Sequence, residues 1–380
     1  MKAGSHILVK KIMLVFGTRP EAIKMCPLVN ELKKREGIKT IVCVTGQHRQ
    51  MLDQVLEVFD VVPDYDLCVM QPKQTLFDIT TNVLESIKSV LVVEKPDIVL
   101  VHGDTSTTFV SALACFYLKI PLGHVEAGLR TYNIYSPYPE EFNRQAVSLI
   151  STYNFAPTEQ ARQNLLDEKK SDESIYVTGN TAIDALKTTV KENYTHELLE
   201  WAKGSRLILL TAHRRENLGK PLENIFSAIR QVVEEFEDIK VIYPIHMNPV
   251  IRKAANRIFN DIDRVMIVEP LDVLDFHNFM ARSYMVLTDS GGVQEEAPSL
   301  GKPVLVLRDT TERPEGVAAG TLKLVGTNKK NLYNELKRLL TDQQAHDAMS
   351  IAANPYGDGF ASKRIADTLE DICLLTAHDF

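Results

Sequence analysis

The sequence predicts an α/β protein with two doubly wound domains that face each other across a cleft. Short apolar runs alternate with helix-like segments along the whole chain, and near-continuous apolar strands between helices indicate a parallel sheet covered on both faces. The alternation restarts near Arg206, which indicates a second sheet. The length of 380 residues also exceeds what one compact domain usually holds.

Buried-strand patterns and helical periodicity place the elements of the first domain. Strands are expected at residues 12–16, 40–45, 97–101 and 121–125, and helices at 21–34, 50–59 and 107–118. The second domain repeats this order. Strands are expected at 206–211, 240–243, 285–288 and 303–307, and helices at 221–236 and 293–300.

A last helix at 359–375 follows a turn-rich segment, and we expect it to cross back onto the first domain. The predicted domains are therefore 1–178 with the C-terminal helix region 358–380, and 179–357. The segment 178–204 is the expected connection between them.

Composition narrows the class of protein. Hydrophobic residues make up 44% and charged residues 24%, as in soluble globular proteins. The net charge of −7 argues against a nucleic-acid partner. The five cysteines form no C-x-x-C pair, which favours reduced thiols and a cytoplasmic location. No apolar run approaches the roughly 20 residues that span a bilayer, so no membrane partner is expected.

A diphosphate site is predicted where the strand at 285–288 meets the next helix. Ser290, Gly291 and Gly292 lie at this junction. The glycines allow close backbone approach, and the free N–H groups of a helix start favour anions. Glu296, less than two helical turns further on, is expected to accept hydrogen bonds from ribose hydroxyls. The alternative is an ordinary strand-to-helix turn.

A second cluster follows the first strand, in the segment 16–24. Gly17 is expected to permit a tight turn, and Pro20 suits a first helical turn. Arg19 and Lys24 are expected to supply cations for the diphosphate across the cleft. The alternative for both is a solvated surface charge.

A third cluster is acidic. Asp104 and Glu126 follow neighbouring strands, and Glu140 follows after a loop. Carboxylates gathered in a cleft are expected to raise each other's pKa and to serve as acid and base. The alternative for Asp104 is a helix N-cap, and for Glu140 a charge in a first helical turn. Glu141 is expected either on a solvated face or as a partner of Arg144.

His213 is the fourth candidate. Arg214 and Arg215 follow it directly, and their repulsion is expected to favour the neutral imidazole, which can carry a proton or bind a phosphate. Histidines and acids elsewhere lack the grouping of metal ligands, and the sequence contains neither a G-x-G-x-x-G nor a P-loop motif. We therefore expect no metal and no cofactor.

These segments together resemble the signature set of the bacterial non-hydrolysing UDP-N-acetylglucosamine 2-epimerases. They are residues 17–24, 102–105, 125–131, 139–141, 213–217 and 288–296. The resemblance runs from about residue 12 to the last helix. It implies two Rossmann-like domains arranged as in the GT-B glycosyltransferases, usually in a homodimer. It also implies interconversion of UDP-N-acetylglucosamine and UDP-N-acetylmannosamine for teichoic acid linkage units, capsules or enterobacterial antigen.

The resemblance also assigns roles to residues. Catalytic roles fall on Asp104, Glu126, Glu140 and His213. Contacts to the UDP-sugar fall on Arg19, Ser290, Gly291 and Glu296, with Phe276 on the uracil side and Lys24 and Arg144 at the sugar and phosphate end. Gly292 and Arg313 complete the expected substrate-binding set.

Some bacterial members of this family bind a second UDP-N-acetylglucosamine that activates turnover. The corresponding candidates here are Gln47, Gln50, Arg214 and Glu216, together with Lys73, which stands where related enzymes can carry Arg. The alternative for this loop is a helix N-terminus with solvated side chains.

Elimination of UDP across C1–C2 to a 2-acetamidoglucal, followed by re-addition, would invert C2. It needs a diphosphate clamp and at least two proton-transfer groups. Three rival functions remain: a hydrolysing 2-epimerase, a GT-B glycosyltransferase and a non-enzymatic UDP-sugar sensor. The three carboxylates and the histidine favour elimination over the last two.

Overall fold

The computed structural model describes residues 9–375 except 47–48, 70, 72–73 and 312. The described residues up to Ala185, together with those from Gly357 onward, form one compact unit. Leu186–Tyr356 form a second unit. We call these the N-terminal and C-terminal units. In the described residues, no helix is both long enough and apolar enough to cross a bilayer.

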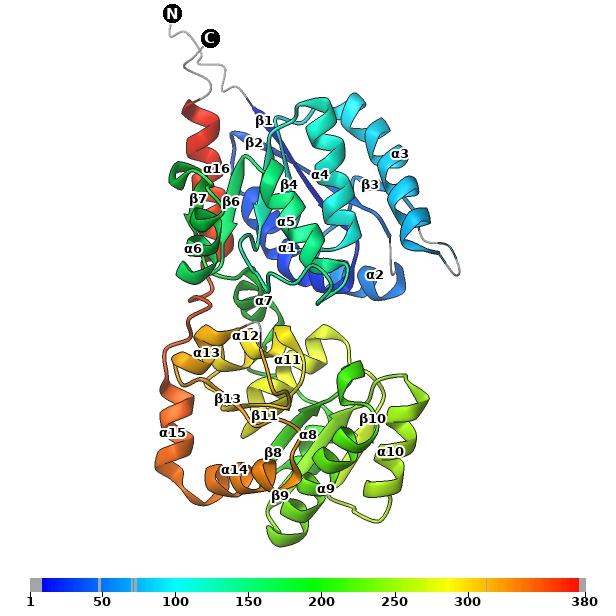
Figure 1. Ribbon diagram of the computed structural model, residues 1–380, viewed down its shortest axis with the longest axis vertical. Coiled ribbons are helices and arrows are strands. Elements are labelled where there is room, and N and C mark those ends of the chain that lie inside the picture. The colour runs from blue at the N-terminus through cyan, green and yellow to red at the C-terminus, as the bar shows by residue number, and fades with distance from the viewer. Residues whose placement is uncertain (1–8, 47–48, 70, 72–73, 312, 376–380) are drawn as a thin grey trace, which may run out of the picture. The chain divides into compact units, whose positions relative to one another are not determined.

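The N-terminal unit is built on a seven-stranded sheet in which every neighbouring pair is parallel (Figure 1). The strand order is β3-β2-β1-β4-β5-β6-β7. The strands are β1 (Lys10–Phe16), β2 (Ile38–Val44), β3 (Tyr65–Asp66), β4 (Ile98–His102), β5 (Leu122–Val125), β6 (Tyr153–Ala156) and β7 (Ile175–Val177).

Helices cover both faces of this sheet. They are α1 (Arg19–Leu32), α2 (Arg49–Val58), α3 (Leu76–Glu94), α4 (Ser106–Leu118), α5 (Glu140–Ile150), α6 (Glu159–Asp167) and α16 (Ala361–Leu375). Helix α4 packs between α3 and α5, and their apolar side chains form one core cluster with the strands. Helix α1 packs against α2 and α16.

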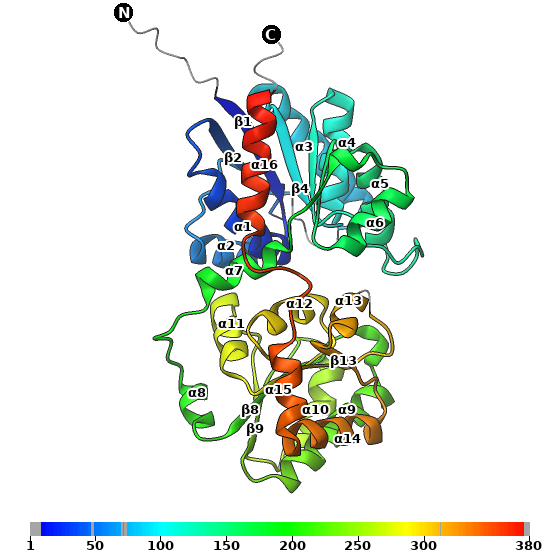
Figure 2. The ribbon, with the colours of Figure 1, turned by 90° about the vertical axis from the view of Figure 1, so that its left-hand side faces the viewer.

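The last helix, α16, lies against the first helix, as Figure 2 shows. Arg35 fixes this contact, because its guanidinium pairs with Asp367 at 2.7 Å and with Glu370 at 3.0 Å. The C-terminal segment therefore belongs to the unit that the N-terminal half builds.

The C-terminal unit contains a six-stranded sheet, again with parallel neighbours, in the order β10-β9-β8-β11-β12-β13. The strands are β8 (Arg206–Thr211), β9 (Ile239–Pro244), β10 (Val265–Val268), β11 (Met285–Thr288), β12 (Val304–Val306) and β13 (Leu322–Leu324). The predicted α/β class with two doubly wound sheets is confirmed.

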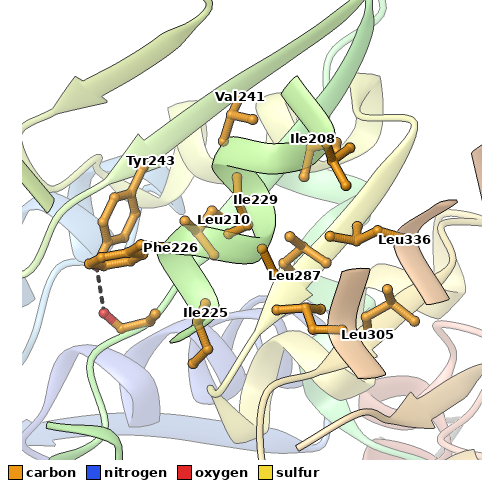
Figure 3. Close-up of a cluster of buried hydrophobic side chains, with 14 of the residues drawn as sticks. Ile208, Leu210, Ile225, Phe226, Ile229, Val241, Tyr243, Leu287, Leu305 and Leu336 are labelled. Atoms are coloured by element: carbon orange, nitrogen blue, oxygen red, sulfur yellow. Dashed lines mark hydrogen bonds between the residues drawn. The ribbon is translucent and has the colours of Figure 1, made fainter. Parts of the chain in front are cut away.

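The helices of this unit alternate with its strands. They are α9 (Lys220–Glu235), α10 (Pro249–Phe259), α11 (Val273–Arg282), α12 (Gly291–Ser299), α13 (Pro314–Ala318), α14 (Lys329–Thr341) and α15 (Gln343–Ile351). The core under α9 contains fully buried side chains such as Phe226 and Leu287 (Figure 3). Each such side chain contributes about 1.5–3 kcal/mol through burial. Tyr243 satisfies its hydroxyl by donating to the carbonyl of Ala212 at 2.8 Å.

The expected connection at 178–204 contains two helices, α7 (Thr181–Thr189) and α8 (Glu197–Ala202). Trp201 of α8 is partly buried against the core of the C-terminal unit. The ammonium of Lys240 lies 4.7 Å from the centre of its ring. Helix α8 is therefore anchored to the C-terminal unit by an apolar contact and a cation–π contact.

Candidate functional site

The N-terminal unit gathers two of the predicted carboxylates at adjacent strand ends. Strands β4 and β5 are paired in parallel, with His102 opposite Val125. Asp104 lies two residues beyond the end of β4, and Glu126 follows β5 directly. Adjacent parallel strands end at the same edge of a sheet, which is where ligands of open α/β sheets bind.

Glu126 is held in a strained backbone and a charged pocket. Its φ of 65° lies in the left-handed region, at a cost of about 1–3 kcal/mol for a residue with a side chain. Its carboxylate, 10% exposed, accepts a hydrogen bond from the ammonium of Lys24 and another from Asn180 Nδ2 at 3.1 Å. His102 Nε2 lies 3.6 Å away.

These neighbours decide the ionisation of Glu126. Burial by itself raises the pKa of the carboxyl, but the positive charge of Lys24 and the contact with His102 outweigh burial and hold the pKa well below its ordinary value. The expectation that clustered carboxylates raise each other's pKa is therefore wrong for Glu126. The reason is that a cation 102 positions away in the sequence pairs with it.

Asp104 behaves in the opposite way. Burial raises the pKa of its carboxyl, Arg144 opposes this effect, and the negative charges of Glu126 and Glu140 add to it. Arg144 Nη2 donates to Oδ2 of Asp104 at 2.6 Å. The N-cap alternative for Asp104 is wrong, since the N-cap of α4 is Thr105, whose hydroxyl accepts from the N–H of Thr108 at 3.1 Å.

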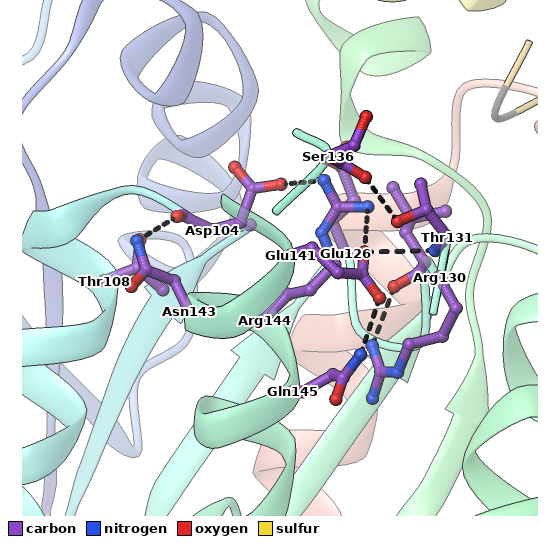
Figure 4. Close-up of polar contacts among 12 residues, drawn as sticks. Asp104, Thr108, Glu126, Arg130, Thr131, Ser136, Glu141, Asn143, Arg144 and Gln145 are labelled. Atoms are coloured by element: carbon purple, nitrogen blue, oxygen red, sulfur yellow. Dashed lines mark hydrogen bonds and ion pairs between the residues drawn. The ribbon is translucent and has the colours of Figure 1, made fainter. Parts of the chain in front are cut away.

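Arg144 bridges Asp104 to a buried anchor, Glu141 (Figure 4). Glu141 is completely buried, so its placement on a solvated face is wrong, whereas its pairing with Arg144, at 3.3 Å, is confirmed. The carboxylate also accepts the backbone N–H groups of Thr131 and Tyr132, both at 3.0 Å. Glu141 therefore holds the loop that follows Glu126. It also holds the side chain of Arg144, which contacts Asp104.

Glu140 occupies the first turn of α5, as its alternative interpretation required. Its charge acts on Asp104 and raises the pKa of that carboxyl. The same helix also holds the backbone of the β4 end, because Asn143 Nδ2 donates to the carbonyl of Asp104 at 2.9 Å. Helix α5 thus supplies a carboxylate, a guanidinium and an amide to one small region.

Glu21 joins the ends of β1 and β4, and the sequence did not identify it. Its buried carboxylate accepts the N–H of Gly17 at 3.0 Å and of Thr18 at 2.7 Å. It also accepts the hydroxyls of Thr105 at 2.7 Å and Thr108 at 3.1 Å.

Gly17 is required here for space, since a Cβ atom would clash with the hydroxyl of Thr45 and lie 2.9 Å from the hydroxyl oxygen of Thr107. Gly17 lies in the two-residue connection between β1 and α1, and this close packing explains why the position has no side chain. Arg19 is the first residue of α1, and it is partly exposed.

The residues of the predicted diphosphate site lie at the start of α12 in the C-terminal unit. Ser290 is the N-cap, and its hydroxyl makes no cap hydrogen bond to the described first turn of the helix. A Cβ atom on Gly291 would lie 2.6 Å from Nη1 and 2.9 Å from Cζ of Arg313. The guanidinium of Arg313 is therefore packed against the helix start, where Glu295 accepts from its Nε at 2.8 Å.

Glu296 and Phe276 lie in the same unit. The buried carboxylate of Glu296 faces His277 Nε2 at 3.5 Å, and a Cβ atom on Gly292 would lie 3.6 Å from Glu296 Oε1. Phe276 of α11 is partly buried against the core of the unit. A positive helix start, a guanidinium and a buried carboxylate are the groups that a nucleoside diphosphate needs.

His213 follows β8 and rests on Asp289, a residue to which the sequence assigned no role. Nδ1 of His213 lies 3.3 Å from Oδ1 of Asp289. The pKa of His213 is lowered mainly by desolvation, with Asp289 opposing and with His246 and Arg214 adding to the shift. The expected neutral form is thus favoured, but loss of solvation contributes more than repulsion by Arg214.

The candidates for a second ligand site are only partly described. Arg214 Nε donates to the carbonyl of Asp289 at 3.2 Å, and Glu216 lies 3.4 Å from Nε of Arg308, beside a cavity of about 270 Å³. Gln47, Lys73 and the side chain of Gln50 lie outside the described residues. Within the described part of the chain, no three His, Cys, Asp or Glu side chains group as metal ligands do.

Known proteins resemble the chain over nearly its whole length. A family model described as UDP-N-acetylglucosamine 2-epimerase matches residues 30–370. A Bacillus subtilis protein named UDP-N-acetylglucosamine 2-epimerase is 63% identical over 359 residues, which cover 94% of each chain.

Two solved structures extend this similarity to the fold. The S. aureus MnaA–UDP co-structure matches with a TM-score of 0.89 and 54% identity, over 95% of this chain and 96% of that one. UDP-GlcNAc 2-epimerase from Neisseria meningitidis, bound to UDP-GlcNAc, matches with a TM-score of 0.88 and 49% identity, over 95% of this chain and 100% of that one.

Proposed function

The chain belongs to the UDP-N-acetylglucosamine 2-epimerase family, and on that basis we propose that it interconverts UDP-N-acetylglucosamine and UDP-N-acetylmannosamine without releasing the free sugar. The enzyme is an isomerase. One observation supports this proposal most directly. Asp104 and Glu126 follow adjacent strands, yet their environments displace their pKa values in opposite directions. Two carboxyls separated in this way can act as acid and base at the same pH.

The proposed reaction is an elimination followed by an addition. The C2 hydrogen of the sugar has no neighbouring carbonyl, so it cannot leave through a simple enolate. Instead, a base removes the C2 proton while the C1–O bond to UDP breaks, which forms the C1=C2 double bond of a 2-acetamidoglucal. UDP then adds back to C1, and an acid delivers a proton to the opposite face of C2.

The C-terminal unit supplies groups suited to the leaving UDP. We assign the diphosphate to the start of α12, with Ser290, Gly291, Gly292 and Arg313 as its contacts. Support comes from the packed guanidinium at that helix start. Charge-assisted hydrogen bonds of this kind are worth about 1.5–3 kcal/mol each. Glu296 is assigned to the ribose and Phe276 to the uracil side.

The N-terminal unit supplies the remaining groups. Asp104, Glu126 and Glu140, with His213 of the C-terminal unit, are assigned to proton transfer at C2 and at the leaving group. Arg19, Lys24 and Arg144 are assigned to the charged sugar and phosphate end. Lys24 also lowers the pKa of Glu126, and Arg144 opposes the rise in the pKa of Asp104, because each forms an ion pair with one of these carboxylates.

Turnover in D₂O, followed by NMR, tests the proposal. Elimination must place deuterium at C2 of both nucleotide sugars, with free UDP and the glucal as minor products. Inversion with retention of the original hydrogen would contradict the mechanism. Accumulation of free N-acetylmannosamine would instead identify a hydrolysing enzyme. An unchanged spectrum that responds only to an added acceptor would identify a glycosyltransferase.

A further inference from the structure

A single buried carboxylate, that of Asp289, joins the ends of β8 and β11. The side chain is completely buried. Its Oδ2 accepts the backbone N–H groups of His213 and Arg214, each at 2.9 Å, and the Nδ2 group of Asn217 at 3.0 Å. The loop that presents His213 is therefore folded around this carboxylate.

Asp289 also contacts the imidazole of His213. Nδ1 lies 3.3 Å from Oδ1 of Asp289, while the imidazole side chain is 41% exposed. The ring therefore runs from a buried carboxylate toward the protein surface, and it stacks on His246 with ring centroids 5.8 Å apart. A carboxylate accepts hydrogen bonds and cannot donate them when ionised, so it favours a proton on the nitrogen nearest to it.

We propose that Asp289 is a positioning residue that holds His213 as the Nδ1–H tautomer and leaves the Nε2 lone pair to exchange protons. The assignment of that proton to a nucleotide sugar rests on the proposed function. The tautomer itself is a property of the free protein. If the carboxylate served only to hold the loop, its three N–H donors would be sufficient. In that case it would have no effect on the tautomer of the His213 imidazole.

The charges around the imidazole determine whether the pKa of His213 should rise or fall when Asp289 is replaced. Asp289 favours the protonated ring, whereas His246 and Arg214 disfavour it. Asp289→Asn removes the attraction and keeps the repulsion. The pKa of His213 should therefore fall further in this variant, and the preference for the Nδ1–H form should disappear.

The decisive measurement is ¹⁵N NMR of the ligand-free protein with labelled histidine, in which His213→Asn identifies the His213 signals. We expect Nδ1–H to dominate in the wild type, although free histidine prefers Nε2–H. In Asp289→Asn the population of the Nε2–H form should increase, and the imidazole should titrate at lower pH. Asp342→Asn, which removes the charge of the N-cap carboxylate of α15 in the same unit, is the matched control and should leave both signals unchanged.

Two results would overturn the inference: a dominant Nε2–H form in the wild type, or an unchanged tautomer in folded Asp289→Asn. The wild-type measurement does not depend on Asp289→Asn, so it stands even where that variant fails to fold. It also stands where no epimerase activity is found, which separates this inference from the proposed function.

A double-mutant cycle in kcat distinguishes the positioning role of Asp289 from a purely structural role. If Asp289 acts through His213, the double variant should lose no more kcat than His213→Asn alone, within about twofold. Losses of kcat that multiply would show that the two residues act independently and would contradict the positioning role.

Discussion

Lys24 and Glu126 form an ion pair in which each side chain is only 10% exposed. Removing one partner leaves the other charge buried without compensation, which typically costs about 3–5 kcal/mol. Lys24→Met should therefore lower the free energy of unfolding at pH 7 by about 3 kcal/mol, since His102 and Asn180 still contact the carboxylate.

The loss of unfolding free energy in Lys24→Met should become smaller as the pH falls. In the wild type the pKa of Glu126 lies below the ordinary value of 4.5, so its stabilisation is complete above that pH and is lost as pH falls through the folded-state pKa. In Lys24→Met the pKa rises, and the stability difference from wild type should shrink toward acidic pH. Urea unfolding near neutrality and near the ordinary pKa measures this. Lys34→Met, at an exposed pair with Glu31, is the control, and an equal loss at both pH values would contradict the assignment.

The acidic residues can be neutralised with little change of shape. Asp104→Asn, Glu126→Gln and Glu140→Gln should each lower kcat by about 10²- to 10⁴-fold, the usual worth of a general acid or base. Glu159→Gln, in the first turn of α6 and 76% exposed on its side chain, is the matched control for Glu140. Steady-state kinetics with circular dichroism measures the effect. A folded variant with near-wild-type kcat would remove that residue from the mechanism.

A single methyl group tests the diphosphate site. The Cβ of Gly291→Ala would push the guanidinium of Arg313 away from the start of α12. Loss of one charge-assisted contact should weaken UDP binding by roughly 10- to 100-fold. Calorimetry measures the affinity, and an unchanged melting temperature shows that the helix tolerates alanine. Wild-type affinity for UDP would place the diphosphate elsewhere.

The reverse reaction tests the second ligand site. With UDP-N-acetylmannosamine as sole substrate, we expect a lag that trace UDP-N-acetylglucosamine abolishes, because a ligand that prefers one conformation shifts the population toward it. Gln47→Ala should remove this activation and leave UDP binding intact. Lys73 lacks the bidentate fork of arginine, so the effect is expected to be weak. Progress curves without a lag would contradict the second ligand site and would leave this loop with only a structural role.

Local patterns in the sequence predicted much of the fold. The strands β8 and β11 span the residues expected for them, because buried apolar runs between turns leave little ambiguity. Helix α3 was not identified. It contains threonine and valine residues with low helix propensity, and it is stabilised by packing against α4.

The site was predicted at the level of residue types but not of pairings. Asp104, Glu126 and His213 were identified as candidates because each follows a predicted strand. Residues that follow the strands of a parallel sheet lie along its carboxyl edge. The sequence could not pair Glu126 with Lys24 or His213 with Asp289, because those contacts join residues 102 and 76 positions apart. The sign of a pKa shift follows from such pairings, which explains why the expected upward shift of Glu126 was wrong.

The position of Trp201 makes the two units spectroscopically distinguishable. It is the single tryptophan of the chain, and it packs on the core of the C-terminal unit. Intrinsic fluorescence excited at the indole therefore reports on that unit alone, whereas far-ultraviolet ellipticity reports on both. A thermal melt followed by both signals would show whether the units unfold together. If the two midpoints differ, the fluorescence midpoint belongs to the C-terminal unit.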